Sequence, residues 1–381
     1  MATAIEPGLV DELQAYGADD VSKCYNCGNC SAVCVHSEAP FVLPRRSMHA
    51  LQLGLEDKLK GSLEPWLCYY CGECSEQCPK GAEPGETMMS LRRWLTSRYD
   101  FSGISRLFYR SWRWELFAVL LAALLTGIGF ALFGMSQGSI SHYDGANAFL
   151  PSAKIHVFDW SMAIVLVVLL GINSIRMWRF VMGRDSGVRA PFGSYLASLY
   201  TLPLHFFTQL KYRQCERRRP WAVHLALMLS YVTMLVLIMF FLREMASGPS
   251  IDWRVHVFGY AASAGLIVAV ALNLRGRIKR SSPQYAHSHE SDWLFLVLLL
   301  VVAGTGVLQH VLHRSGLDTA ANVTYIVHLM GVVPMLVLEV PFGKWAHMAY
   351  RPLAVYFARV RVHAQATAAA KAEKIAAAAA S

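Results

Sequence analysis

Eight of the nine cysteines lie in two matching runs near the start of the chain, and the ninth, Cys215, is expected to be an ordinary thiol. The first run, CYNCGNCSAVC, has C-x2-C-x2-C-x3-C spacing at Cys24, Cys27, Cys30 and Cys34. The second run, CYYCGECSEQCP, repeats it at Cys68, Cys71, Cys74 and Cys78. Three thiolates at this spacing can wrap one face of a cubane, and in two-cluster ferredoxins the fourth cysteine ligates the other cluster. The spacing therefore predicts two 4Fe–4S clusters.

The predicted ligand sets cross between the two runs. One cluster is expected on Cys24, Cys27, Cys30 and Cys78, and the other on Cys68, Cys71, Cys74 and Cys34. Zinc is one alternative, but zinc sites favour two C-x2-C pairs and rarely need a third cysteine at the same spacing. Disulfides are another, but they need an oxidising compartment, and the acidic first 20 residues do not resemble a signal peptide.

The composition divides the chain into an acidic start and a basic, apolar remainder. Of the 381 residues, 55% are apolar and 16% charged, whereas soluble chains have about 45–50% and about 25%. This balance excludes a purely soluble enzyme and a largely disordered protein. The lysines and arginines lie between apolar runs rather than on one patch facing water, so no nucleic-acid partner is expected.

Six apolar stretches of about 20 residues follow the cysteine runs, and each is long enough to cross a membrane as a helix. They lie at 114–134, 155–182, 221–242, 254–274, 292–312 and 323–343. With a cytoplasmic N-terminus, the inner segments carry 25 lysines and arginines and the outer segments 4. The positive-inside rule therefore predicts that the cluster domain and the C-terminus are cytoplasmic.

Histidines in or beside these stretches predict haem sites, because ionisable residues in membrane spans are rare and imidazole is a common axial ligand of haem iron. His224 and His347 lie near the cytoplasmic ends of the third and sixth stretches and are predicted to hold an inner haem b. For an outer haem, His328 is expected with His256 as its partner. Three histidines compete for that second place: His310, His313 and His156. Some of these histidines could instead be hydrated in the headgroup zone.

One acidic residue, Glu339, lies at membrane depth between His328 and His347. A carboxyl there could carry a quinone proton near the inner face, which makes Glu339 the candidate catalytic residue. The alternative is a buried carboxyl that is simply hydrogen-bonded.

The predicted fold is mainly α, with an α-helical two-cluster ferredoxin-like domain followed by a six-helix transmembrane cytochrome b bundle. Residues 1–91 are expected to form the cluster domain and 92–113 an interfacial linker. Residues 114–350 are expected to form the membrane domain, and 351–381 a cytoplasmic tail.

Together these motifs resemble a known arrangement over nearly the whole chain. The cysteine runs resemble an HdrC-like two-cluster ferredoxin module. RRRPWAVHLALMLSY around His224 and PFGKWAHMAYRP around His347 resemble the haem-binding helices of an HdrE/NarI-like cytochrome b module. The fused order is similar to the QmoC family, the C-type component of the quinone-interacting membrane-bound oxidoreductase (Qmo) complex.

That resemblance implies a multi-pass subunit of a quinone-dependent oxidoreductase in a prokaryotic cytoplasmic (inner) membrane. It implies electron transfer between menaquinone and soluble HdrA-like flavin/iron–sulfur subunits of the Qmo A and B type, linked to adenylylsulfate reductase in sulfur metabolism. An equivalent subunit of a heterodisulfide-reductase-like, hydrogenase or electron-transferring-flavoprotein complex is an open alternative, and a membrane redox sensor is another. No Cys-Cys-Gly occurs in the sequence, so disulfide chemistry on this chain is not expected.

Overall fold

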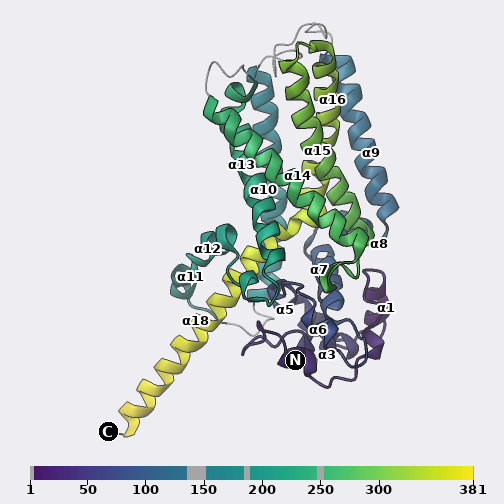
Figure 1. Ribbon diagram of the computed structural model, residues 1–381. Coiled ribbons are helices and arrows are strands. Elements are labelled where there is room, and N and C mark those ends of the chain that lie inside the picture. Colours follow the sequence, from purple (N-terminus) through teal and green to yellow (C-terminus); the bar gives the residue numbers. More distant parts are fainter. Residues whose placement is uncertain (1–3, 135–151, 184–188, 247–252, 381) are drawn as a thin grey trace.

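The computed structural model describes residues 4–134, 152–183, 189–246 and 253–380. These parts are almost entirely helical, as Figure 1 shows, and the only strand-like pairing among them is an isolated bridge between Glu38 and Phe41. The structure confirms the predicted mainly helical fold. The side chain of His156 lies outside the described residues.

Residues 4–99, called the head below, form a compact set of short helices around one longer helix. They are α1 (Leu9–Gln14), α2 (Asn29–Ala32), α3 (Arg45–Gln52), α4 (Glu56–Lys60), α5 (Glu64–Leu67), α6 (Glu73–Glu76) and α7 (Pro84–Tyr99), with a 3₁₀ turn at Val21–Lys23. Helices α1, α3, α5 and α6 pack on α7. The core holds aromatic side chains that are almost fully buried, including Trp66, Trp94 and Tyr99. The domain boundary expected at 91/92 lies inside α7.

Six helices of the remaining chain are long and apolar enough to cross a membrane. These candidate spans are Trp112–Leu132, Val157–Met182, Arg219–Phe241, Trp253–Lys279, Glu290–Arg314 and Asp318–Phe342. Their helices are α9 (Trp112–Gly129), α10 (Ser152–Met182), α13 (Arg219–Ala246), α14 (Trp253–Lys279), α15 (Glu290–Arg314) and α16 (Asp318–Pro334). Neighbours pack in the order α13, α14, α15, α16 and α9. The chain therefore has the helices of a multi-pass membrane protein, as the sequence predicts.

The sixth span changes its winding before it ends. Pro334 has no backbone N–H to donate, which interrupts the hydrogen bonding of the α-helix. A π-helical turn at Met335–Glu339 follows it. The short α17 (Val340–Phe342) completes the span, and π-helical residues Phe130–Gly134 likewise extend α9. The winding leaves the Glu339 side chain buried in the protein.

Shorter elements join the spans to the head. They are α8 (Ile104–Arg110), α11 (Phe192–Ser198), α12 (Thr201–Thr208), and 3₁₀ turns at Tyr212–Gln214, Pro283–Tyr285 and Lys344–Ala346. The last helix, α18 (His347–Ala380), packs on α5 of the head and on α10, α11 and α12. Its C-terminal part projects away from the rest of the molecule in Figure 1.

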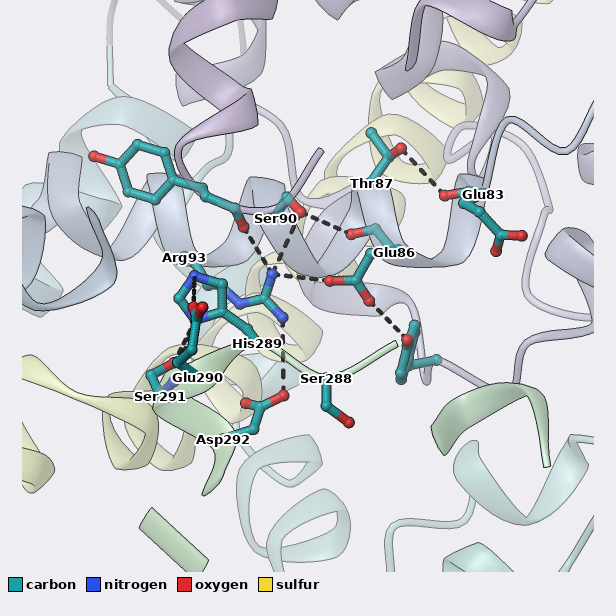
Figure 2. A network of polar contacts seen from close by, with 12 residues as sticks. Glu83, Glu86, Thr87, Ser90, Arg93, Ser288, His289, Glu290, Ser291 and Asp292 are labelled. Atoms are coloured by element: carbon teal, nitrogen blue, oxygen red, sulfur yellow. Dashed lines mark hydrogen bonds and ion pairs between the residues drawn. The ribbon is translucent and has the colours of Figure 1, made fainter. Parts of the chain in front are cut away.

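A buried ion-pair network fastens the head to the membrane part. Asp292, at the start of α15, pairs with Lys344 and lies 3.4 Å from Arg277 and 3.9 Å from Arg93 of α7. Arg93 in turn lies 2.9 Å from the carboxylate of Glu86, which Figure 2 shows beside it. Removing one member of such a network leaves an unpaired buried charge, which is strongly destabilising. The network therefore holds α7 against the membrane helices.

Candidate functional site

The two cysteine loops share one backbone conformation. Asn26 and Tyr70 occupy equivalent positions, and both are left-handed, with φ of 58° and 53°. This conformation strains a residue that is not glycine, so the surrounding structure must stabilise it. It aims the backbone N–H of each residue at a sulfur, 3.5 Å from Cys24 Sγ and 3.3 Å from Cys68 Sγ. Amides aimed at sulfur are among the contacts that tune iron–sulfur clusters.

The first loop lines a pocket together with one cysteine from the second run. The pocket is lined by Cys24, Tyr25, Asn26, Cys27, Gly28, Asn29, Cys30, Arg45, Cys78, Pro79, Lys80 and Pro84. Burial raises the pKa of the Cys30 thiol, and the neighbouring Cys24, Cys27 and Cys78 raise it further. The structure therefore brings together Cys78 and the first three cysteines of the first run.

The other four cysteines form a second group. Burial raises the pKa of Cys34 to about 12, with a further contribution from the nearby Cys68 and Cys71. Burial also raises the pKa of Cys74, which lies close to Cys34, Cys68 and Cys71. Bound iron would offset the cost of deprotonating these buried thiols, because a metal ligated by sulfur holds the cysteine in its thiolate form.

Each cysteine group has the four sulfur ligands that one 4Fe–4S cluster takes. A structural zinc site draws four ligands to one ion, whereas a cubane presents its iron atoms over a larger body. The two groups of four cysteines therefore suit 4Fe–4S clusters.

His224 and His347 face each other at the junction between the membrane helices and the head. Their ring centroids are 6.3 Å apart. His224 donates its Nδ1 proton to Gln209 Oε1 at 2.9 Å, and His347 donates its own to the backbone carbonyl of Lys344. Burial lowers the pKa of His347 to about 3, so this ring is neutral near pH 7. Each ring therefore keeps its Nε2 lone pair available.

This histidine pair suits a metal held between two imidazoles. Nitrogen ligands lie about 2 Å from a metal, so a separation of 6.3 Å between the ring centroids would leave room for one metal ion between the two rings. The hydrogen bonds at Nδ1 are those that orient metal-bound histidines. The pair lines a pocket with Tyr69, His205, Phe206, Gln209, Met228, Met348, Arg351 and Pro352.

Aromatic side chains connect this histidine pocket to the second cysteine group. Tyr69 lines the pocket and follows Cys68 directly in the chain. Its ring stacks on Tyr212 at 5.2 Å between centroids, and Tyr212 meets His224 edge-on at 6.1 Å. The guanidinium of Arg351 lies 3.8 Å from the Tyr69 ring centroid and donates to the Cys68 carbonyl at 3.0 Å. The second cysteine group is thus in contact with the histidine site.

The outer histidines are arranged differently from the inner pair. The ring of His256 contacts His310, with centroids 5.4 Å apart, and its buried Nε2 has no hydrogen-bond partner within the described part of the chain. His328 lies against α15, where its Nδ1 is 3.1 Å from the hydroxyl of Thr305. His313 lies beside the aspartate that begins α16. The described ring contacts therefore join His256 to His310 and not to His328.

Glu339 has a buried partner that the sequence prediction did not include. Glu115, near the start of α9, is fully buried, and its carboxyl group lies against that of Glu339. Glu339 Oε2 also accepts the Lys344 backbone N–H at 3.3 Å. Two adjacent buried carboxylates repel each other when both are charged. The sequence signal that could have identified Glu115 is its place as an acidic residue at the start of the apolar stretch at 114–134.

The comparisons with known proteins identify the head. Residues 20–82 match the model of the 4Fe-4S dicluster domain. A heterodisulfide reductase HdrC-like protein of Archaeoglobus profundus is 30% identical over 104 residues, which is 27% of this chain and 55% of that protein. The chain thus spans about half the length of this curated relative. No solved structure matches the chain. The N-terminal part is accordingly a 4Fe–4S dicluster domain that holds two clusters for electron transfer, and six candidate membrane spans follow it.

Proposed function

We propose that this chain is the membrane subunit of a quinone-dependent oxidoreductase that passes electrons between menaquinone and soluble flavin/iron–sulfur subunits. The bound clusters and b-type haems supply the electron-carrying chemistry, and the protein sets their spacing and surroundings. The observation that carries this proposal is the contact between the second cysteine group and the histidine pocket through Tyr69. Carriers placed there would be neighbours within one chain.

The cluster ligands follow from the two cysteine groups. Cluster 1 takes Cys24, Cys27, Cys30 and Cys78, and cluster 2 takes Cys68, Cys71, Cys74 and Cys34. Cluster 2 is then the one beside the histidine pocket. In cluster 1, Cys27 is exposed and the neighbouring Tyr25 side chain is 57% exposed, so cluster 1 faces the surroundings of the head. A soluble partner would exchange electrons on that side.

The haem ligands and the proton-carrying residue lie in the membrane part. His224 and His347 hold the inner haem. His328 holds an outer haem with His256 as its partner, and His310 competes for that place because it contacts His256. Glu339 carries the quinone proton, and the adjacent Glu115 supports its proton exchange.

The partners and the location follow from the resemblance and the charge pattern. The soluble partners are HdrA-like subunits of the Qmo A and B type, with adenylylsulfate reductase beyond them in sulfur metabolism. The name of the archaeal relative, which likens it to the HdrC component of heterodisulfide reductase, supports partners of the heterodisulfide reductase kind. The excess of lysines and arginines in the inner segments orients the head toward the cytoplasm of a prokaryote.

Electron entry from quinol tests this function directly. The oxidised chain, purified with its companions from solubilised membranes, is mixed with a menaquinol analogue and followed by stopped-flow absorbance. We expect b-type haem bands to rise and the absorbance of the clusters to bleach after them. A haem-free protein with stable clusters would contradict the proposal and favour a sensor. Identifying the companions by mass spectrometry separates the Qmo type from a hydrogenase or flavoprotein complex.

Proton exchange at Glu339 gives a second test. In Glu339→Gln the size of the side chain is kept but proton transfer is lost, so haem reduction by the quinol analogue should slow by about 10²- to 10⁴-fold. Reduction of the clusters by dithionite should be unchanged. Glu290→Gln is the matched control, because the Glu290 side chain is 64% exposed at the start of α15. Equal rates for the two variants would remove Glu339 from the reaction.

A further inference from the structure

A segment of the membrane part lies directly on the second cysteine loop of the head. It comprises residues 212–217, between α12 and α13. The backbone N–H of Glu216 donates to Glu73 Oε1 at 3.1 Å, and Arg217 makes two hydrogen bonds to the carboxylate of Glu76, at 3.0 and 3.1 Å. Glu73 and Glu76 are the ends of α6, so the segment is docked beside the second cysteine group.

This docking places the ninth cysteine against a cluster ligand. Cys215 is only 2% exposed and packs with Tyr69 and Tyr212, and Cys71 packs against the same cluster of side chains. Cys71 therefore packs beside the buried Cys215 thiol, and Cys215 Sγ lies 3.5 Å from His36 Nε2. Cys215 belongs to neither group of four cysteines, so its S–H is available as a donor.

We propose that Cys215 is a positioning residue that donates an S–H hydrogen bond to Cys71 Sγ and raises the reduction potential of cluster 2. The inference rests on the proposed function, in which Cys71 is a ligand of that cluster. Reduction adds negative charge to the cluster and its sulfurs, so a donor to a sulfur stabilises the reduced state more than the oxidised state. His36 accompanies the pair, because its Nε2–H can donate to Cys215 Sγ in turn.

The equivalent cysteine of cluster 1 has a different environment. Cys27 occupies the position in the first run that Cys71 occupies in the second, and Cys27 is exposed where Cys71 is partly buried against Cys215. The hydrogen bond from Cys215 therefore acts on cluster 2 and leaves cluster 1 as an internal reference. It makes electron transfer from cluster 1 to cluster 2, toward the histidine pocket, more favourable.

Redox titration of the whole complex, followed by electron paramagnetic resonance, tests this assignment. Cys215→Val keeps an apolar side chain of similar size but removes the donor. We expect the equilibrium constant for reduction of cluster 2 to fall by about tenfold, which lowers its reduction potential by about 59 mV for one electron. The potential of cluster 1 should not change. Cys215→Ser keeps a donor and should shift the potential much less. The cluster 2 signal is the one lost in Cys74→Ala.

A control variant separates hydrogen bonding from docking. Arg217→Gln breaks an ion pair whose two side chains are 43% and 42% exposed, and it should leave both potentials unchanged. Equal potentials for cluster 2 in Cys215→Val and the unmodified complex would overturn the inference. So would the loss of cluster 2 in both Cys215 variants, because Cys215 would then be needed to hold the cluster. If the potential of cluster 2 is unchanged in Cys215→Val but both cluster signals are intact, the proposed function still holds and only the role of Cys215 is overturned.

Discussion

His347→Ala is expected to remove the inner haem while both iron–sulfur clusters remain. The imidazole of His347 lies opposite His224, and the Lys344 carbonyl accepts its Nδ1–H, so alanine deletes one of the two ligands proposed for this haem. If two haems are bound, the haem content should fall by about half, and quinol should no longer reduce the clusters. Pyridine haemochrome assay and reduced-minus-oxidised spectra measure the loss.

A histidine on the same helix supplies the control for this variant. His363 is also on α18, but its Nδ1 lies 3.1 Å from the Ser194 hydroxyl, and it is not among the residues that line the histidine pocket. His363→Ala should keep the full haem content. Unchanged haem in His347→Ala would show that the inner ligand has been assigned wrongly, whereas parallel losses in both variants would indicate general damage to α18.

Cys74→Ala is expected to abolish cluster 2 and stop electron transfer between the haem and external acceptors. Cys74 is 8% exposed and lies among Cys34, Cys68 and Cys71, so no solvent ligand can readily replace its sulfur. Iron should fall from about eight to about four atoms per chain, because each cubane holds four. Iron analysis and low-temperature electron paramagnetic resonance would measure it.

The first cysteine group provides the matched comparison. Cys30 is the equivalent residue of the first run, and it is 9% exposed. Cys30→Ala should remove the other cluster signal and leave the one lost in Cys74→Ala. If both variants lost the same signal, the crossed ligand sets would be wrong. Retention of about eight irons in either variant would argue that the altered cysteine is not a ligand.

The sequence predicted the features that depend on nearby residues. The cysteine runs have a spacing that ligates clusters through local loops, and the family match over residues 20–82 agrees with two 4Fe–4S clusters. The six spans were also predictable, because a helix in lipid needs about 20 apolar residues whatever it packs against. The third, for example, was expected at 221–242 and is found at Arg219–Phe241.

Features that depend on packing between distant segments were not predictable in the same way. Arg92 and Arg93 were expected in an interfacial linker, yet both are buried in α7. Arg93 is stabilised there by Glu86 and by Asp292, which is far away in sequence. Charge and aromatic content alone do not reveal such partners. Cys215 looked ordinary for the same reason, because its contact with Cys71 exists only after the segment docks.

The ion-pair network around Asp292 has a consequence for how fast electrons can move. Some electron-transfer proteins carry a redox centre on a tethered domain that must swing between its donor and its acceptor. Here ion pairs among Arg93, Asp292 and Lys344 hold the head against the membrane helices. Helix α18 also packs on both the head and the membrane helix α10. Cluster 2 and the histidine pair would keep one separation, so exchange between them would not wait on domain diffusion or depend on solvent viscosity.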